Sequence, residues 1–185
     1  MDSESMASAA ALCAGVADLA RKYTRPPRES TVDAGAIVTA LNQFQECVRY
    51  LNTRRSTGAI LKLDSEAAVQ DAIYLMLRPW ISDLNYESPT SRVSNRYVIK
   101  DFISPSAETV IEIKFIRDEP HGKNISKEMH DDIEMYRRHP HCRTLVFFVY
   151  DPASLIPDQE ALKSQIETPR AYGDINLTCV LIVKP

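Results

Sequence analysis

Two short runs of almost wholly apolar residues constrain the fold of this chain most. They are TLVFFVY at residues 144–150 and TCVLIV at residues 178–183. A strand that is apolar on both faces has to be covered on both faces, as the central strands of a helix-flanked sheet are. Because segments with helical spacing lie before and between these runs, the sequence predicts an α/β or α+β domain with a mixed β-sheet.

The remaining elements of this domain follow from spacing and turn chemistry. The turn residues Ser104-Pro105-Ser106 separate two β-like runs, which predicts a hairpin. Residues 117–123 are expected to form a loop before the next helix. The expected elements are a helix at 65–80, strands near 86 and at 96–103 and 109–116, a helix through 125–136, a strand at 144–150, a helix at 158–167 and a strand at 178–183.

The first 58 residues differ in character and read as two helices. One is expected at residues 12–23 and is stopped by Thr24-Arg25-Pro26-Pro27, and a second is expected to begin after Thr31 or Asp33. Apolar residues in the second recur at alternating steps of four and three, which suits a helical hairpin or a dimer contact. These residues are Ile37, Leu41, Phe44, Val48 and Leu51. We therefore expect an N-terminal helical hairpin at 1–58 and a main domain at 59–185.

Charge and processing signals restrict the class of protein. With 22 Lys and Arg against 25 Asp and Glu, the net charge is −3, so any contact with nucleic acid has to come from local basic groups or bound cations. The apolar stretch at 6–17 follows Asp2 and Glu4, lacks the basic start of a signal peptide, and is too short to cross a membrane. The four cysteines are scattered and form no CxxC pair, so we expect a cytoplasmic protein with reduced thiols and no membrane association.

One strand carries two charges where the pattern calls for apolar residues. In VIEIKFI at 110–116, Glu112 and Lys114 are two residues apart and must project from the same face. Buried charges are costly unless they are paired or bound to a metal, so such a pair often marks a functional site. Two structural readings stay open: an edge strand with one wet face, or a plain ion pair.

Two further acids can join this pair. Asp101 lies eleven positions before Glu112, a separation that a short hairpin can close, and Glu66 starts the helix at 65–80. Carboxylate oxygens suit Mg²⁺ or Mn²⁺, which keep several waters and bind phosphate oxygens. The lysine would orient or deprotonate an attacking water, and the metal would neutralise charge at the phosphorus.

The order of a helix with Glu66, a strand with Asp101, the EIK strand, a helix and an apolar strand resembles the PD-(D/E)XK nuclease superfamily. The resemblance covers residues 61–185 and is nearest to the restriction-endonuclease-type members of prokaryotic restriction and anti-phage defence. It implies a restriction-endonuclease-like α/β fold. It implies Asp101, Glu112 and the carbonyl of Ile113 as metal ligands, Lys114 as the water-activating group, and Glu66 as support for the metal or its water. The residue before Asp101 is Lys100, where the family pattern has proline.

The resemblance also points to supporting residues. Asp132 and Tyr136 fall where related nucleases have a polar residue followed four positions later by tyrosine, and Gln70 lies one turn after Glu66. Tyr136 can equally be a core residue, and Gln70 a surface amide. Five basic residues would contact the phosphate backbone, or would simply be a solvated face: Arg92, Arg96, Lys100, Arg117 and Lys123.

These observations predict a Mg²⁺- or Mn²⁺-dependent endonuclease that hydrolyses DNA phosphodiester bonds in restriction or anti-phage defence. RNA stays open as a substrate. A homodimer would supply the two sites that double-strand cleavage needs, and a companion protein of the defence system would supply the trigger. The alternative is a nuclease-like subunit that binds nucleic acid or assembles with partners without catalysing a reaction.

Overall fold

The computed structural model of the chain describes residues 32–53, 58, 60–86, 101–172 and 175–185. The helix predicted at 12–23 and the first part of the strand predicted at 96–103 lie outside these residues. Among the described helices, none is both long and apolar enough to cross a membrane.

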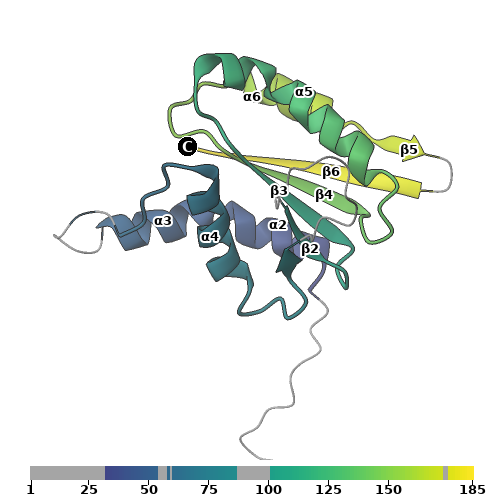
Figure 1. Cartoon of the computed structure of the whole chain (residues 1–185), viewed down its shortest axis with the longest axis horizontal. Helices are drawn as coiled ribbons and strands as arrows, with labels where there is room; N and C mark the ends of the chain where they lie inside the picture. The colour runs from purple at the N-terminus through teal and green to yellow at the C-terminus, as the bar shows by residue number, and fades with distance from the viewer. Residues whose placement is uncertain (1–31, 54–57, 59, 87–100, 173–174) are drawn as a thin grey trace, which may run out of the picture. The chain divides into compact units, whose positions relative to one another are not determined.

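A six-stranded mixed sheet in the order β1-β2-β3-β4-β6-β5 organises the described residues (Figure 1). β1, β2 and β3 are antiparallel, β3, β4 and β6 are parallel, and β5 runs antiparallel to β6. The predicted mixed sheet is therefore confirmed. Its strands are β1 (Asn85–Tyr86), β2 (Asp101–Ser104), β3 (Thr109–Phe115), β4 (Thr144–Tyr150), β5 (Arg170–Tyr172) and β6 (Ile175–Lys184).

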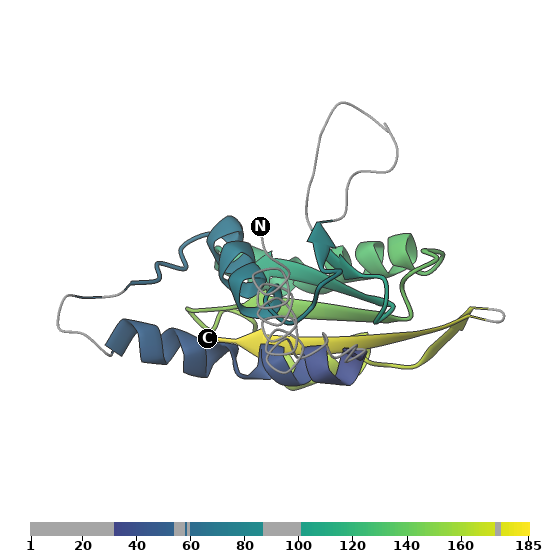
Figure 2. The same ribbon diagram turned by 90° about the horizontal axis from the view of Figure 1, so that it is seen from below.

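Helices cover both faces of this sheet, as the apolar central strands require. Figure 1 shows α5 (Glu119–Tyr136) and α6 (Gln159–Ile166) on one face and α2 (Ala34–Asn42), α3 (Phe44–Thr53) and α4 (Glu66–Leu77) on the other. Figure 2 shows α2 and α3 following one another along the sheet. Each face has its own apolar core, and alternate residues of β3 and β4 belong to one or the other. The predicted α/β fold with helices on both sides is confirmed.

The helix expected after Asp33 is divided in two. Asp33 caps α2 by accepting a hydrogen bond from the backbone N–H of Ala36 at 2.7 Å. At Gln43 the backbone N–H bonds the carbonyls of both Ala40 and Leu41, a tighter turn that separates α2 from α3.

The apolar seam of these two helices is used inside the chain. Ile37, Leu41, Phe44 and Val48 are buried in the core that α2, α3 and α4 form with the sheet. The ring of Phe44 packs edge-on against that of Phe148, with centroids 4.9 Å apart. The sequence left open a hairpin or a dimer contact for this seam, and its residues face the sheet of their own chain.

The start of α5 corrects a prediction, because residues 117–123 were expected to be a loop. The helix begins at Glu119, six residues before the expected apolar stripe. The Asp118 carboxylate caps it by accepting from the N–H of His121 at 2.8 Å, and Pro120 lies in its first turn, where a missing N–H is tolerated.

The other boundaries are close to the predicted ones. β4 matches its predicted range, α4 begins after its Ser65 cap, and α6 after its Asp158 cap. α4 ends at Leu77, earlier than the predicted residue 80. β5 was not predicted, and β6 begins at Ile175, three residues before its apolar run.

A carboxylate far away in sequence fixes the β2–β3 hairpin. Asp83 accepts hydrogen bonds from the Ser104 hydroxyl at 2.9 Å and from the backbone N–H of Ser106 at 2.7 Å. Partial burial alone would raise the pKa of Asp83, but these hydrogen bonds outweigh it and lower the pKa below its usual value. The hairpin that carries Asp101 and Glu112 is thus tied to the segment that follows α4.

Candidate active site

The alternation of β3 directs the two charged residues toward α5. Ile111 and Ile113 belong to the core on the α2–α4 face, whereas Val110 belongs to the core on the α5–α6 face. Glu112 and Lys114 share the face of Val110, as their spacing predicts. Both are buried, with exposed fractions of 1% for Glu112 and 5% for Lys114.

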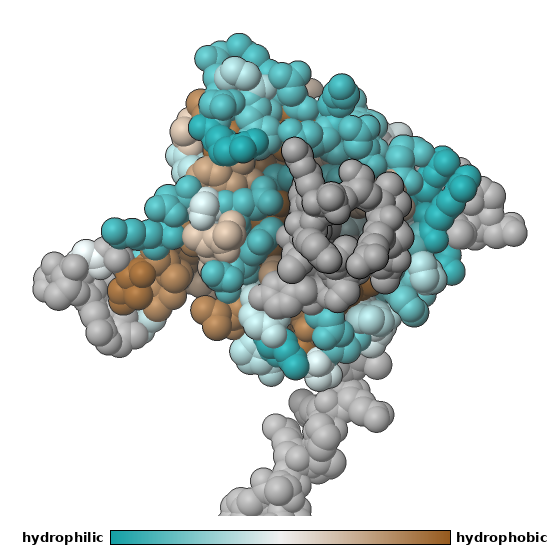
Figure 3. Space-filling view, viewed as in Figure 1, coloured by the Kyte–Doolittle hydropathy of each residue, from teal (hydrophilic) through white to brown (hydrophobic). Residues whose placement is uncertain are grey.

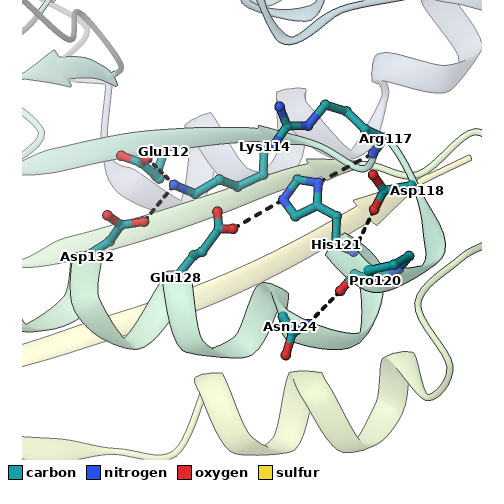
Figure 4. Close-up of polar contacts among 9 residues, drawn as sticks. All are labelled: Glu112, Lys114, Arg117, Asp118, Pro120, His121, Asn124, Glu128 and Asp132. Atoms are coloured by element: carbon teal, nitrogen blue, oxygen red, sulfur yellow. Dashed lines mark hydrogen bonds and ion pairs between the residues drawn. The ribbon is translucent and has the colours of Figure 1, made fainter.

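The ammonium of Lys114 lies between two carboxylates from different elements (Figure 4). Its Nζ is 2.6 Å from Oε1 of Glu112 on β3 and 2.7 Å from Oδ2 of Asp132 on α5. The edge-strand reading is wrong, because β3 lies between β2 and β4. An ion pair does form, and it links the strand to the helix that covers it.

This arrangement keeps Lys114 charged. Burial alone would lower the pKa of Lys114, but the negative charges of Glu112 and Asp132, together with hydrogen bonds to both, outweigh it and raise the pKa above its ordinary value. Lys114 is therefore a charged hydrogen-bond donor, held in one position by two acceptors.

The backbone places Asp101 directly opposite Glu112. The two residues are Cα partners in the antiparallel pairing of β2 with β3. The Asp101 side chain lies outside the described part of the structure. β3 continues past this pair through Ile113, whose carbonyl is the third expected ligand, to Phe115.

The donor set of these three positions fits a hard divalent cation. It offers two carboxylates and a backbone carbonyl, all oxygen ligands of the kind that Mg²⁺ and Mn²⁺ prefer. Among the side chains that the structure describes, no group of three His, Cys, Asp or Glu lies close enough to hold a metal on its own. Within that part of the chain, Glu112 is the predicted metal ligand whose side chain is placed.

Glu66 and Gln70 lie on the helix that covers the opposite face. Glu66 is the first residue of α4 and is half-buried, and Val69 of the same helix packs in the core on the α2–α4 face. The ion pairs that the structure describes for Lys114 are with Glu112 and Asp132, and Glu66 takes part in neither. Gln70, one turn later, is also half-buried.

Tyr136 belongs to the core under α5. Its side chain is 2% exposed and its ring packs edge-on against that of His139, with centroids 6.0 Å apart. Tyr136 and Asp132 lie one turn apart on α5, but they have different surroundings: Asp132 reaches the charged pair on β3, and Tyr136 packs with apolar residues.

A second polar pair lies on the same helix and was missed by sequence reasoning. The side chain of His121 is 9% exposed, and its Nε2 lies 3.5 Å from Oε1 of Glu128. Its Nδ1 accepts a hydrogen bond from the backbone N–H of Arg117 at 3.4 Å (Figure 4). The sequence signal for this pair was the spacing of His121, Glu128 and Asp132. They are seven and four residues apart, which places them on one face of a helix.

The basic residues expected to contact DNA are only partly described. Arg92, Arg96 and Lys100 lie outside the described residues. Arg117 is exposed in the connection from β3 to α5. Lys123 is exposed on the first turns of α5 and pairs with Glu119 at 2.6 Å. Figure 3 shows a mainly hydrophilic surface over the region of α5.

Comparison with known proteins agrees with this architecture. A family model described as the DpnII-MboI restriction endonuclease matches residues 36–183, a range that runs from α2 to β6 and includes Glu66, Asp101, Glu112 and Lys114. No curated protein matches the chain. No solved structure matches it. The resemblance to the PD-(D/E)XK nucleases is confirmed, and the chain belongs to the DpnII-MboI restriction endonuclease family, a PD-(D/E)XK-type family of DNA endonucleases.

Proposed function

We propose that this DNA endonuclease is Mg²⁺-dependent and that its active site is built on the β2–β3 hairpin. The observation that carries the proposal is the buried pair Glu112 and Lys114 on an internal strand, with Asp101 in direct register with Glu112. Burying two charges in such a strand costs stability even when they pair, so their presence there points to a functional site.

Each residue of the hairpin has an assigned part in this proposal. Asp101, Glu112 and the carbonyl of Ile113 hold Mg²⁺ or Mn²⁺. The bound cation supplies Lewis-acid chemistry, stabilising negative charge on the phosphate oxygens as the phosphodiester is cleaved. Lys114 orients or deprotonates the attacking water, and Glu66 supports the metal or its water.

The remaining residues support the site or the substrate. Asp132 holds Lys114. Tyr136 supports the site indirectly, because its buried ring anchors α5 in the core one turn after Asp132. Gln70 supports it from α4, on the other side of the sheet. The basic residues Arg92, Arg96, Lys100, Arg117 and Lys123 contact the DNA backbone without reading bases. Because the net charge of the chain is −3, bound cations and these local charges have to attract the phosphates.

The biological setting that we propose is restriction or anti-phage defence in the cytoplasm. Double-strand cleavage needs two active sites, which a homodimer supplies. A companion protein of the defence system supplies the trigger.

Nicking of supercoiled plasmid in the presence of Mg²⁺ tests the proposal. We expect the wild-type protein to nick the plasmid and Lys114→Ala to lose activity by a factor of about 100 or more. Lys163→Ala is the matched control, because Lys163 is an exposed lysine on α6 outside the proposed site. Equal cleavage by the wild type and Lys114→Ala would contradict the assignment. DNA binding without divalent-ion binding at millimolar concentration would instead favour the catalytically inactive subunit.

A further inference from the structure

Lys114, Glu112 and Asp132 form a triad in which one cation is shared by two acids. Nζ lies at nearly equal distances from the two carboxylates, 2.6 Å from Glu112 and 2.7 Å from Asp132. The three side chains are 6%, 1% and 17% exposed in the order Lys114, Glu112, Asp132. Because charges this deeply buried need compensation, the ammonium serves as the internal counter-ion of both carboxylates.

A divalent cation on Glu112 changes this balance. The carboxylate that receives the cation already holds an ammonium, and two positive groups on one carboxylate repel each other at short range and low dielectric. The contact between Lys114 and Glu112 therefore has to weaken when the cation binds.

Asp132 provides a second anchor for the displaced ammonium. It comes from α5, so its position does not depend on the strand that carries Glu112. The lysine side chain is a flexible four-carbon stem, so its ammonium can pivot toward Asp132 while staying in the site. Without this acid, release from Glu112 would leave a buried ammonium with one fewer partner, which is unfavourable.

We propose that Lys114 and the divalent cation compete for Glu112, and that Asp132 sets the affinity of the site for the cation by retaining Lys114. Asp132 is then a positioning residue that acts through Lys114, not a ligand of the metal. This inference rests on the proposed function, since it takes Glu112 as a metal ligand.

Mn²⁺ binding to the full chain without DNA tests this by calorimetry and by the loss of the free-Mn²⁺ electron paramagnetic resonance signal. Removing the competing ammonium in Lys114→Met should tighten Mn²⁺ binding about tenfold. Asp132→Asn should weaken it about fivefold, because Lys114 then stays on Glu112. In the Lys114→Met background, Asp132→Asn should change the Mn²⁺ affinity by less than about threefold, because Asp132 acts on the metal site only through Lys114.

The controls separate the possible failures. Glu134→Gln changes an exposed acid two residues from Asp132 and should leave Mn²⁺ affinity unchanged. If Asp132→Asn weakens binding equally with and without Lys114, Asp132 is a ligand and the inference is overturned. Unchanged affinity in Lys114→Met also overturns it, while the proposed function stands. If neither the wild type nor Lys114→Met binds Mn²⁺, the metal site itself is absent and the proposed function fails.

A second readout covers the case in which a variant folds poorly. Mn²⁺ binds only the folded site, so its stabilisation of the protein reports affinity. The rise in melting temperature on adding Mn²⁺ should be larger for Lys114→Met than for the wild type. Lys114→Gln, which keeps a polar group, should behave in the same direction, and a smaller rise in both variants would count against competition.

Discussion

A β-carbon at Gly122 would lie 2.4 Å from the backbone carbonyl oxygen of Leu155. The loop of Leu155 is itself fixed, because the buried carboxylate of Asp151 accepts from the N–H groups of Leu155 and Ile156 at 2.8 and 3.0 Å. The first turns of α5 are thus set against the segment after β4 by direct backbone contact. The same helix brings Asp132 to Lys114, so this contact helps to position the site.

Gly122→Ala should destabilise the protein, because the clash is with a backbone atom that cannot turn away. We expect a loss of about 1–3 kcal/mol in the free energy of unfolding, measured by urea denaturation. Gly35→Ala in α2 is the control, since its nearest contact would be an ordinary 3.4 Å to Asp33. That variant should be neutral or slightly stabilising, by up to about 1 kcal/mol, because alanine favours a helix. Equal effects of the two changes would refute the close-approach explanation.

The cap of α5 gives a second stability prediction. Asp118→Ala removes the acceptor for the His121 N–H, and we expect a loss of about 1 kcal/mol in the free energy of unfolding. Asp118→Asn keeps a capping oxygen and should lose much less. A thermal melt of the three proteins compares them directly, and an equally large loss in both variants would show that charge, not capping, matters at this position.

The hydrogen bonds that Asp83 accepts from the β2–β3 hairpin predict that the stability of the protein depends on pH. Because its pKa is lowered in the folded protein, the stabilisation is fully present above the ordinary value of 3.8 and is lost as the pH falls through the lower folded value. Asp83→Asn should therefore lose about 1 kcal/mol at pH about 7 and progressively less toward pH about 3. Urea denaturation over this range measures the difference.

Asp71→Asn serves as the reference for that experiment. Asp71 is exposed on α4 and accepts none of the hydrogen bonds that the structure describes around the hairpin. Its replacement should change stability little at any pH. A difference between the wild type and Asp83→Asn that stays constant with pH would contradict the role of the Asp83 charge.

Leu41 is one of the apolar residues of α2 and α3 that pack in the core, so a charged residue at this position should destabilise the fold. Leu41 is fully buried in the core on the α2–α4 face, so Leu41→Asp should unfold or severely destabilise the chain, by about 3 kcal/mol or more. Circular dichroism and light scattering together test this. A folded variant that changes only its oligomeric state would show instead that Leu41 lies at an interface between chains.

The parts of the fold that sequence reasoning predicted best depend on short-range patterns. The apolar run of β4 requires burial on both faces, and the two-residue period places Glu112 and Lys114 together, wherever the strand lies in the sheet. The start of α5 was mispredicted because its charged and Gly- and Pro-containing first turn looks like a loop. The cap at Asp118 and the early Pro120 were the signals that favoured a helix.

Contacts between distant segments could not be predicted in the same way. Asp83 and Ser104 are 21 positions apart, and no periodicity relates them. Asp132 was expected to support the site on the strength of a family resemblance, but its contact with Lys114 depends on how α5 lies across β3. β5 is three residues long, which is too short for a periodic pattern to reveal it. The first residues of β6 precede the continuous apolar run from which that strand was predicted, and they pair with β5.

The placement of β3 between two separate cores makes the chain intolerant of odd-numbered changes in length within that strand. One residue inserted between Glu112 and Ile113 would move every later residue of β3 to the opposite face of the sheet. Lys114 would then point among the aromatic rings of the α2–α4 face, and Ile113 would take a place beside Asp132. An insertion of two residues would leave each later side chain on its original face of the sheet. Natural variation in this strand should therefore exchange apolar residues for one another at the buried positions, while keeping the two-residue step from Glu112 to Lys114.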